Sequence, residues 1–328
     1  MSFEWLPENV GEVEFLLPLA PLTTLKVGGP VDCLVRPKSW ESVAELMRAK
    51  PEDVPLTVLG LGSNMVVRDG GVAGLVLCLD GVCDSVDAGE AGMLRAEAGA
   101  SLGKVARAAR EHELDGVAFF GGIPGSVGGA LRMNAGAYGD ETYDRLVRVW
   151  VMTDKGDILE KEPAFFEPRY RGTELPEGWI FVAGEWALPR GDKEEIRAAM
   201  RLVNERRRTS QPLGLPSSGS WFKNVIVTEK NRSALVAVFG DEVMPGGKIN
   251  AWRLVEAAGC RGWREGGAQV SEQHCNFFVN IGAHDAKKGE GVAGTFADFA
   301  KLSDRVEAEI LAKLGVTMER EVKYDGRA

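Results

Sequence analysis

Amphipathic stretches and short apolar runs alternate along this chain. Apolar residues that recur every three or four positions predict helices, and runs of about four to eight apolar residues predict buried strands. The helices are expected at 39–50, 101–111, 193–208, 249–258 and 295–314. The strands are expected at 34–36, 54–59, 74–79, 93–98, 146–153, 157–161, 181–188, 275–281 and 316–324. Helices and strands in mixed order over 328 residues predict a protein of two or three domains with ample core.

The segment QPLGLPSSGS, at 211–220, is rich in proline, glycine and serine and is the clearest candidate for a domain boundary. We therefore predict three parts, at 1–80, 81–211 and 212–315. The last strand, within 316–328, is expected to return to the first part. The polar stretch at 284–294, rich in lysine and glycine, is expected to be an exposed, mobile loop.

Two glycine-rich passages, at 60–64 and 121–139, stand out from this pattern. Glycine is favoured where the backbone takes unusual dihedral angles or closely approaches something else. Consecutive backbone N–H groups in such loops can converge on an anion, as they do around phosphates. We therefore predict that the two passages bind a diphosphate-bearing ligand from opposite sides. A pair of tight structural turns is the alternative.

Two common nucleotide-binding signatures are missing from these passages. Met65 stands where a dinucleotide fingerprint needs its third glycine. Gly247 and Lys248 are followed by Ile249, where a P-loop needs serine or threonine. The sequence therefore argues against a Rossmann or P-loop enzyme.

Charge and cysteine usage narrow the class of protein. A net charge of −9 and a pI near 5.2 argue against a nucleic-acid binder. The acidic N-terminus is unlike a signal peptide, and no apolar run is long enough to span a membrane, so we expect a cytoplasmic protein. The five cysteines are scattered without a CxxC pair, which predicts reduced thiols and no metal site.

Four motifs, in this order, resemble those of UDP-N-acetylenolpyruvoylglucosamine reductases, which are bacterial cell-wall enzymes that carry FAD. They are GLGSNMVVRDGGVAGLVL at 60–77, GGIPGSVGGALRMNAGAYGDE at 121–141, SSGSWFKN at 217–224 and GGAQVSEQHCNFFVN at 266–280. The resemblance implies an α+β fold: a two-part FAD-binding domain of the flavin-oxidase (PCMH-like) type, followed by a C-terminal α+β substrate-binding domain. The parts at 1–80 and 81–211 would bind FAD, and 212–315 would bind the substrate.

The resemblance assigns a ligand to the glycine loops. Both would hold the FAD pyrophosphate through backbone N–H groups, with serine and asparagine side chains adding hydrogen bonds. The implied FAD-binding residues are Gly60, Gly62, Ser63, Asn64, Gly122, Ile123, Pro124, Gly125, Ser126, Gly128 and Gly129. Neither loop contains the histidine or cysteine that tethers flavin in some relatives of this fold, so the FAD is expected to be non-covalent.

The resemblance also implies three catalytic residues. Ser220, in SSGSWFKN, would donate a proton to the carbon next to the substrate carboxylate, with help from Lys223 or Asn224. Arg171 and Glu321 would stabilise the enolate-like charge that builds before this proton arrives. From the residues alone, Ser220 is a turn hydroxyl, and Arg171 and Glu321 are members of surface ion pairs.

Four residues are expected to bind the substrate: Lys223, Asn224, His274 and Lys323. His274 has an alternative role as a core-facing structural histidine. Lys323 stands where arginine is common, which weakens any bidentate grip on a carboxylate or phosphate. Val225 replaces a usual proline, the stretch after Asn280 is longer than usual, and no tyrosine-bearing insertion is present, so the chain resembles the shorter type of the family.

The implied activity is the NADPH-driven reduction of the enolpyruvyl ether of UDP-N-acetylglucosamine to UDP-N-acetylmuramate, a step of peptidoglycan precursor synthesis. The expected partners are this UDP-sugar and NADPH, with no nucleic acid and no membrane, and the protein is expected to be a monomer. Two alternatives are an oxygen-using FAD oxidase of the same wider fold and a non-catalytic FAD-binding module.

Overall fold

The computed structural model describes residues 2–287 and 291–327, and they form two compact units. The N-terminal unit comprises the described residues of 1–17, 31–61 and 73–209. The C-terminal unit comprises those of 18–30, 62–72 and 210–328. Each unit is therefore built from separate stretches of the chain, and the three-part division at 80 and 211 stays a prediction.

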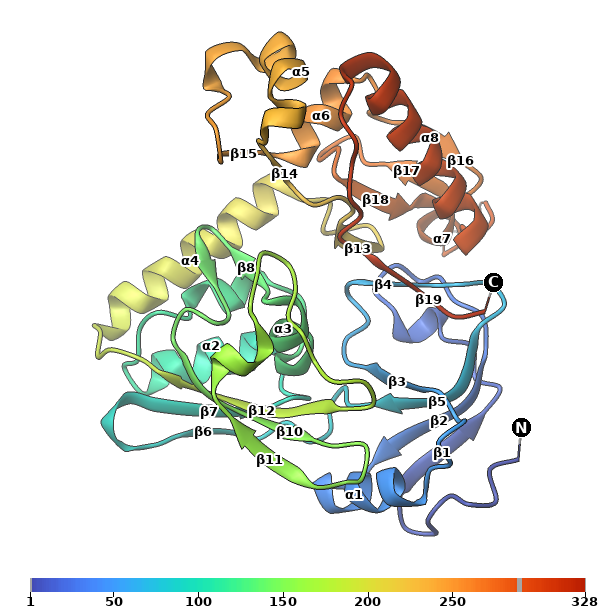
Figure 1. The fold of residues 1–328 in the computed structure, drawn as a ribbon, viewed down its shortest axis with the longest axis vertical. Helices are drawn as coiled ribbons and strands as arrows, with labels where there is room; N and C mark the ends of the chain where they lie inside the picture. The colour runs from blue at the N-terminus through green and yellow to red at the C-terminus, as the bar shows by residue number, and fades with distance from the viewer. Residues whose placement is uncertain (1, 288–290, 328) are drawn as a thin grey trace. The chain divides into compact units, whose positions relative to one another are not determined.

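The N-terminal unit contains two sheets, with strand orders β1-β2-β5-β3 and β11-β10-β12-β7-β6 (Figure 1). Its strands are β1 (Gly11–Phe15), β2 (Val31–Pro37), β3 (Leu56–Leu59), β5 (Val72–Cys78), β6 (Val86–Ala88), β7 (Met93–Glu97), β8 (Gly136–Ala137), β9 (Asp140–Glu141), β10 (Leu146–Met152), β11 (Ile158–Lys161) and β12 (Ile180–Ala187). Its α-helices are α1 (Trp40–Ala49), α2 (Leu102–Glu111), α3 (Val127–Met133) and α4 (Lys193–Ser210). Short 3-10 helices lie at Glu90–Gly92, Ala118–Gly122 and Pro163–Phe166.

Helix starts in this unit follow from local sequence. Ser39 and Ser42 form a reciprocal capping box at the start of α1. Ser101 accepts a hydrogen bond from the Lys104 N–H and so caps α2. The apolar faces of these two helices pack into separate cores, one around Val43 and Leu46 and the other around Val105.

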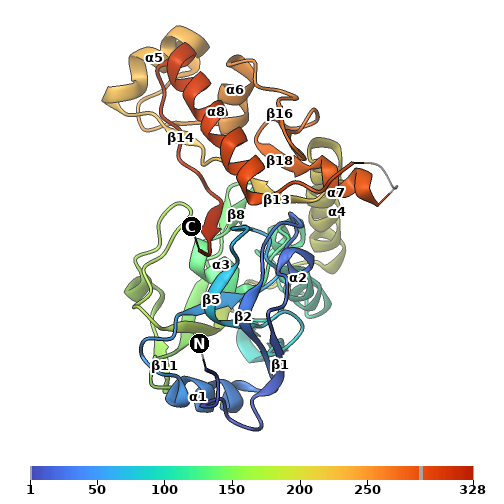
Figure 2. The same cartoon turned by 90° about the vertical axis from the view of Figure 1, so that its right-hand side faces the viewer.

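The C-terminal unit contains a four-stranded sheet in the order β13-β18-β17-β16 and two two-stranded ladders, β14-β15 and β19-β4. Its strands are β4 (Met65–Val67), β13 (Ser217–Ser220), β14 (Val225–Ile226), β15 (Lys248–Ile249), β16 (Arg264–Glu265), β17 (Ala268–Val270), β18 (Phe277–Asn280) and β19 (Lys323–Asp325). Its α-helices are α5 (Glu229–Phe239), α6 (Ala251–Ala257), α7 (Ile281–Ala286) and α8 (Phe296–Leu314), with 3-10 turns at Ala20–Leu22 and Gly240–Glu242. Helix α8 runs beside the sheet and contacts β16 and β17 (Figure 2).

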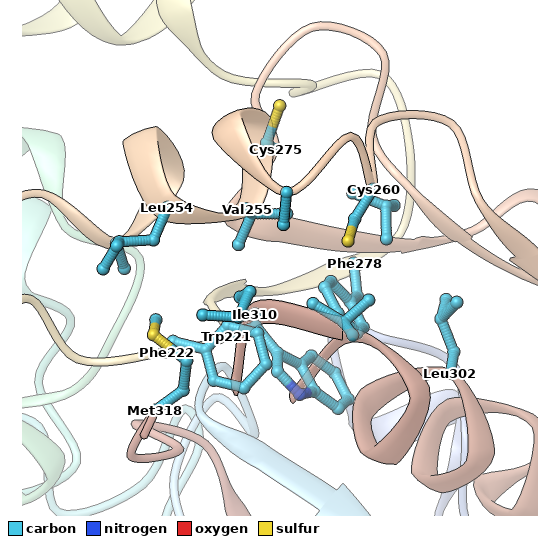
Figure 3. Packing of buried hydrophobic residues seen from close by; sticks show 14 of the residues in the cluster. Trp221, Phe222, Leu254, Val255, Cys260, Cys275, Phe278, Leu302, Ile310 and Met318 are labelled. Atoms are coloured by element: carbon cyan, nitrogen blue, oxygen red, sulfur yellow. The ribbon is translucent and has the colours of Figure 1, made fainter. Parts of the chain in front are cut away.

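Aromatic packing fixes α8 to the sheet of the C-terminal unit (Figure 3). The Trp221 ring stacks on Phe278 at 4.4 Å and on Phe299 at 5.6 Å between centroids. Its indole N–H donates to Ser303 Oγ at 2.8 Å, so the polar edge of this fully buried ring is satisfied. Asp69 accepts hydrogen bonds from the first two N–H groups of α8. The helix dipole favours a negative charge at this N-terminus. Trp221, the residue that follows Ser220, is therefore held firmly in the core of the C-terminal unit.

The structure confirms the expected helices to within a few residues and most of the expected strands. The last strand is much shorter than the 316–324 predicted, because only Lys323–Asp325 pair, with β4. The stretch expected to be a loop at 284–294 begins inside α7, and its residues 288–290 lie outside the described residues. Sequence reasoning did not predict α3, α5 or β13.

Two chemical features of the described residues complete the fold. All five cysteines are free, and four of them are buried. Burial raises the pKa of the Cys33 thiol to about 11 and that of Cys83 to about 12, which keeps both protonated at neutral pH. No helix in the described part of the chain is both long enough and apolar enough to cross a bilayer.

Candidate active site

The start of the first glycine loop, Gly60, approaches the second glycine loop inside the N-terminal unit. A Cβ added to Gly60, just after β3, would lie 2.3 Å from Ser126 Oγ, just before α3. A larger residue at position 60 would require the Ser126 hydroxyl to turn away, so glycine there favours the close approach of these segments. The Leu102 N–H donates to the Gly125 carbonyl at 3.0 Å, which ties the second loop to the start of α2.

Backbone donors in both loops are available to a ligand. Within 2–287 and 291–327, no hydrogen bond has the N–H of Gly125 or Ser126 as its donor, and the same holds for Gly62, Ser63 and Asn64. Gly62 has φ 59°, a left-handed conformation that glycine adopts without strain. Buried N–H groups without partners are rare, and Gly62 and Ser126 are buried. The Gly125–Ser126 donors of the N-terminal unit and the Gly62–Asn64 donors of the C-terminal unit therefore each suit an anionic group.

Two of the predicted FAD contacts are glycine for a reason within the protein itself. A Cβ on Gly122 would lie 2.4 Å from Val203 Cγ1 of α4, and one on Gly128 would lie 3.1 Å from the Cβ of Ala98. The first distance is a clash and the second is a tight contact, so internal packing alone favours glycine at both positions. Their roles as FAD contacts stay predictions, as do those of Ile123, Pro124 and Gly129.

Arg171 lies in the N-terminal unit, at the third position of a tight turn. Arg169 and Gly172 exchange backbone hydrogen bonds of 3.0 and 3.1 Å, with Tyr170 and Arg171 between them. Arg171 has φ 58°, which a turn of this kind normally reserves for glycine. Its guanidinium donates to the Gly136 carbonyl at 3.0 Å and stacks over the Tyr170 ring at 4.8 Å. A strained backbone that presents a fixed arginine is typical of a functional site.

Ser220 ends β13 in the C-terminal unit, after a β-bulge. Ser217 pairs with Val279 and Ser220 with Phe277, so three steps on β13 oppose two on β18. Gly219, inside the bulge, has φ 78°. Bulges re-aim side chains, and this one places Ser220 on the same face of the sheet as Phe277. Ser220 keeps partial exposure, whereas the next residue, Trp221, is fully buried.

The third predicted catalytic residue, Glu321, lies beside this strand. Its N–H donates to the Trp221 carbonyl at 2.8 Å. Asn64 bridges the same segment, because its side-chain amide donates to the Glu321 carbonyl at 3.3 Å and its own carbonyl accepts the Lys323 N–H at 2.9 Å. The C-terminal unit therefore brings together Ser220, Glu321 and a residue of the first glycine loop, which are far apart in sequence.

Two predicted substrate residues already have partners within the C-terminal unit. The Lys223 ammonium lies 2.5 Å from Glu319 Oε1. The Asn224 side-chain oxygen accepts the Ala251 N–H at 3.0 Å, at the first residue of α6. Their assistance to Ser220 stays a prediction. Lys323, the third, is exposed.

His274 is held against the strand that pairs with Ser220. Its ring lies 4.8 Å from the Phe277 ring, and its Nδ1 accepts the Asn276 N–H at 3.3 Å. An accepting Nδ1 assigns the proton of the neutral ring to Nε2. Burial first, and then the nearby Arg261, lower the pKa of His274 below its ordinary value, so the ring is neutral at pH 7. This packing resembles that of a core-facing structural histidine, the alternative role given to His274 above. It leaves the Nε2–H to act as a hydrogen-bond donor.

A cavity of about 430 Å³ opens within the C-terminal unit. Val279 lines it and pairs with both Ser217 and Gln269, so the cavity lies over the sheet face that also carries Ser220. Its lining is Pro212, Gly214, Leu215, Arg264, Gln269, Ser271, Glu272, Gln273, Val279, Ile281 and His284. Sequence reasoning missed the buried polar residues Gln269 and Ser271, although both lie in the GGAQVSEQ motif.

Two family models match the chain. Residues 31–161 match the FAD binding domain, and residues 211–324 match the C-terminal domain of UDP-N-acetylenolpyruvoylglucosamine reductase. A reductase of that name from Paramagnetospirillum magneticum is 37% identical over 98% of this chain and 95% of its own length. This chain belongs to the UDP-N-acetylenolpyruvoylglucosamine reductase family.

Other members of the reductase family agree with this assignment. The reductase from Magnetococcus marinus is 43% identical over 81% of this chain and 80% of its own length. The crystal structure of the Thermus caldophilus reductase superposes with a TM-score of 0.73 at 29% identity, covering 96% of this chain and 98% of that one. The resemblance and the predicted fold class, an FAD-binding domain with a C-terminal substrate-binding domain, are therefore confirmed.

In the described residues, no three histidine, cysteine, aspartate or glutamate side chains are grouped as a metal site would need. The site residues divide between the two units. Arg171 and the second glycine loop belong to the N-terminal unit, whereas Ser220 and Glu321 belong to the C-terminal unit.

Proposed function

We propose that this protein reduces the enolpyruvyl ether of UDP-N-acetylglucosamine to UDP-N-acetylmuramate, with NADPH as the electron source and non-covalent FAD as the cofactor. The observation that carries the proposal is the pair of hydrogen bonds in the C-terminal unit that join Glu321 to Trp221, the residue after Ser220, and Asn64 to Glu321. Membership of the reductase family supports it further. The proposal extends to a monomer that acts in the cytoplasm.

The free N–H groups of Gly125, Ser126 and Gly62–Asn64 would hold the FAD pyrophosphate. When bound, FAD would supply the hydride that adds to one carbon of the enolpyruvyl double bond, and a proton must add to the other. Ser220 then donates a proton to the carbon next to the carboxylate. The bulge at Gly219 sets the direction of this hydroxyl, and the buried Trp221 fixes the backbone behind it.

Arg171 and Glu321 stabilise the charge on the substrate carboxylate before the proton arrives. A guanidinium binds a carboxylate in a fixed plane, and its stacking on Tyr170 limits the ways it can turn. Glu321 helps only when it is protonated or shares a proton, because an ionised carboxylate would repel the enolate.

We propose that the cavity over the sheet face that carries Ser220 binds part of the UDP group. Arg264 offers a positive charge, and the side-chain amides of the buried Gln269 and the exposed Gln273 offer donors and acceptors suited to a nucleotide. His274, with its donor at Nε2, and Lys323 would contact the same substrate. We infer that NADPH uses this pocket in turn with the sugar nucleotide.

Arg171→Gly separates the function of the side chain from the strain of its backbone. It should be more stable to unfolding than Arg171→Ala by about 1 kcal/mol, because alanine is disfavoured at φ 58° and glycine is not. Both variants should slow turnover by ~10²-fold, because both lose the charged group. Urea unfolding and steady-state turnover measure the two effects. Wild-type turnover of Arg171→Gly would remove Arg171 from the mechanism.

One experiment separates the reductase from the oxidase. In air, NADPH with the enolpyruvyl UDP-sugar should be consumed much faster than NADPH alone, with one saturated product formed per NADPH. Rapid peroxide production, equal with and without the UDP-sugar, would favour an oxygen-using oxidase instead. No comparison or contact favours that alternative.

A further inference from the structure

Asn276 makes an unusual set of contacts with the two residues that follow Ser220. The Trp221 N–H donates to the Asn276 backbone carbonyl at 2.7 Å. The Phe222 N–H donates to the Asn276 side-chain oxygen at 3.0 Å, and the side-chain nitrogen donates to the Phe222 carbonyl at 2.8 Å. The side-chain amide therefore continues the ladder as a backbone partner would, at a position that is 3% exposed.

The same segment is held on its other side by the stretch that carries Glu321. The Glu321 N–H donates to the Trp221 carbonyl at 2.8 Å, and Phe222 forms a bridge with Arg320. The backbone from Trp221 to Phe222 thus lies between Asn276 and the catalytic glutamate segment. Any shift of this backbone changes the position of Ser220 relative to Glu321.

Asn276 also contacts His274. Its own N–H donates to Nδ1 of His274 at 3.3 Å. One residue therefore supports the backbone of the proton donor through its side chain and the tautomer of His274 through its main chain.

We propose that Asn276 is a positioning residue that fixes Ser220 for proton transfer to the substrate. The inference rests on the proposed function of Ser220. Small misplacements of a reacting group cost large factors in rate, so the alignment of Ser220 should depend on the Asn276 amide.

The test substitutes Asn276→Asp, which keeps the shape and the acceptor for the Phe222 N–H. At pH 8 the new carboxylate replaces an N–H donor 2.8 Å from the Phe222 carbonyl, so two acceptors face each other. Anaerobic stopped-flow should then show re-oxidation of the enzyme by the enolpyruvyl UDP-sugar slowed roughly 10–10²-fold, and reduction by NADPH nearly unchanged. At lower pH the protonated carboxyl can donate again, and the lost rate should return in part.

Asn280→Asp is the matched control, because Asn280 is a second buried asparagine, at the end of the strand β18 that follows Asn276. Its amide donates to the Leu25 carbonyl at 3.1 Å and its oxygen accepts the Ala283 N–H, away from Ser220. This variant should keep the wild-type re-oxidation rate. Amide hydrogen exchange gives a readout apart from activity: Asn276→Asp should speed exchange at Trp221 and Phe222, and the control should not.

A double-variant cycle decides whether Asn276 acts through Ser220. The double variant Ser220→Ala/Asn276→Asp should re-oxidise no more slowly than Ser220→Ala alone. Without the Ser220 hydroxyl there is no proton donor left for Asn276 to align, so its substitution adds no further loss. Two slowdowns that multiply would overturn the inference, and so would an Asn276→Asp enzyme that keeps the wild-type re-oxidation rate. If Ser220→Ala alone left the re-oxidation rate unchanged, the proposed function of Ser220 itself would fail. The single variant therefore distinguishes failure of the proposed function from failure of the inference about Asn276.

Discussion

Ser220→Ala is expected to slow formation of the saturated product by ~10²–10⁴-fold, the usual effect of losing one well-placed acid. Reduction of the bound FAD by NADPH should stay nearly intact, because Ser220 acts only on the sugar nucleotide. Anaerobic stopped-flow measures the two half-reactions separately. Ser217→Ala is a matched control, since Ser217 lies on the same strand before the bulge and its carbonyl is held by Thr24.

Solvent deuterium adds a second readout to this variant. Deuterium should still appear at the carbon next to the carboxylate in whatever product Ser220→Ala makes, because water must then supply the proton. A variant that turned over at close to the wild-type rate would make Ser220 a turn hydroxyl. Glu321, whose backbone contacts the neighbouring Trp221, would then be the first candidate for the proton donor.

Gly125→Val is expected to abolish FAD binding. The Leu102 N–H donates to the Gly125 carbonyl at 3.0 Å, and this bond resists movement of the loop away from a new branched side chain, which we expect to stand against the phosphates. The flavin content of the purified variant measures the loss. Gly103→Val is the control: apart from its chain neighbours and the backbone of its own helix, no atom lies within 4 Å of a Cβ at Gly103, and this variant should keep its flavin.

The same preparation tests whether the flavin is tethered. Acid precipitation of the wild-type protein should release all of the flavin as FAD into the supernatant. Flavin that stays with the precipitated protein would contradict non-covalent binding. Full flavin content in Gly125→Val would remove the second glycine loop from the FAD site.

Local sequence rules predicted much of this fold. Ser39, Ser101 and Thr295 begin their helices as N-caps because each side-chain oxygen accepts an N–H of the first turn. Helix α3 was missed because its glycines are poor helix formers, and tertiary contacts such as the Gly128 N–H to the Ala98 carbonyl at 2.9 Å support it instead. Long-range contacts of this kind leave no periodic pattern to read.

The site was predictable only through its motifs. The serine and glycine residues at 217–220 suggest a linker, yet they form a strand because they pair with β18. The bulge at Gly219 sets the face of the sheet on which Ser220 lies. No spacing rule could foresee that Arg171 would take a φ suited to glycine. The role of Asn276 depends on the Phe222 backbone, which is distant in sequence, so residue type alone could not reveal it.

The central claim is that electrons pass from NADPH through bound FAD to an enolpyruvyl UDP-sugar. An anaerobic titration of the wild-type protein tests it most directly. The purified protein should be yellow, and NADPH should bleach it. One equivalent of UDP-N-acetylenolpyruvoylglucosamine should then restore the colour and yield one equivalent of UDP-N-acetylmuramate. A colourless protein, or a colour that returns only when oxygen is admitted, would contradict the account.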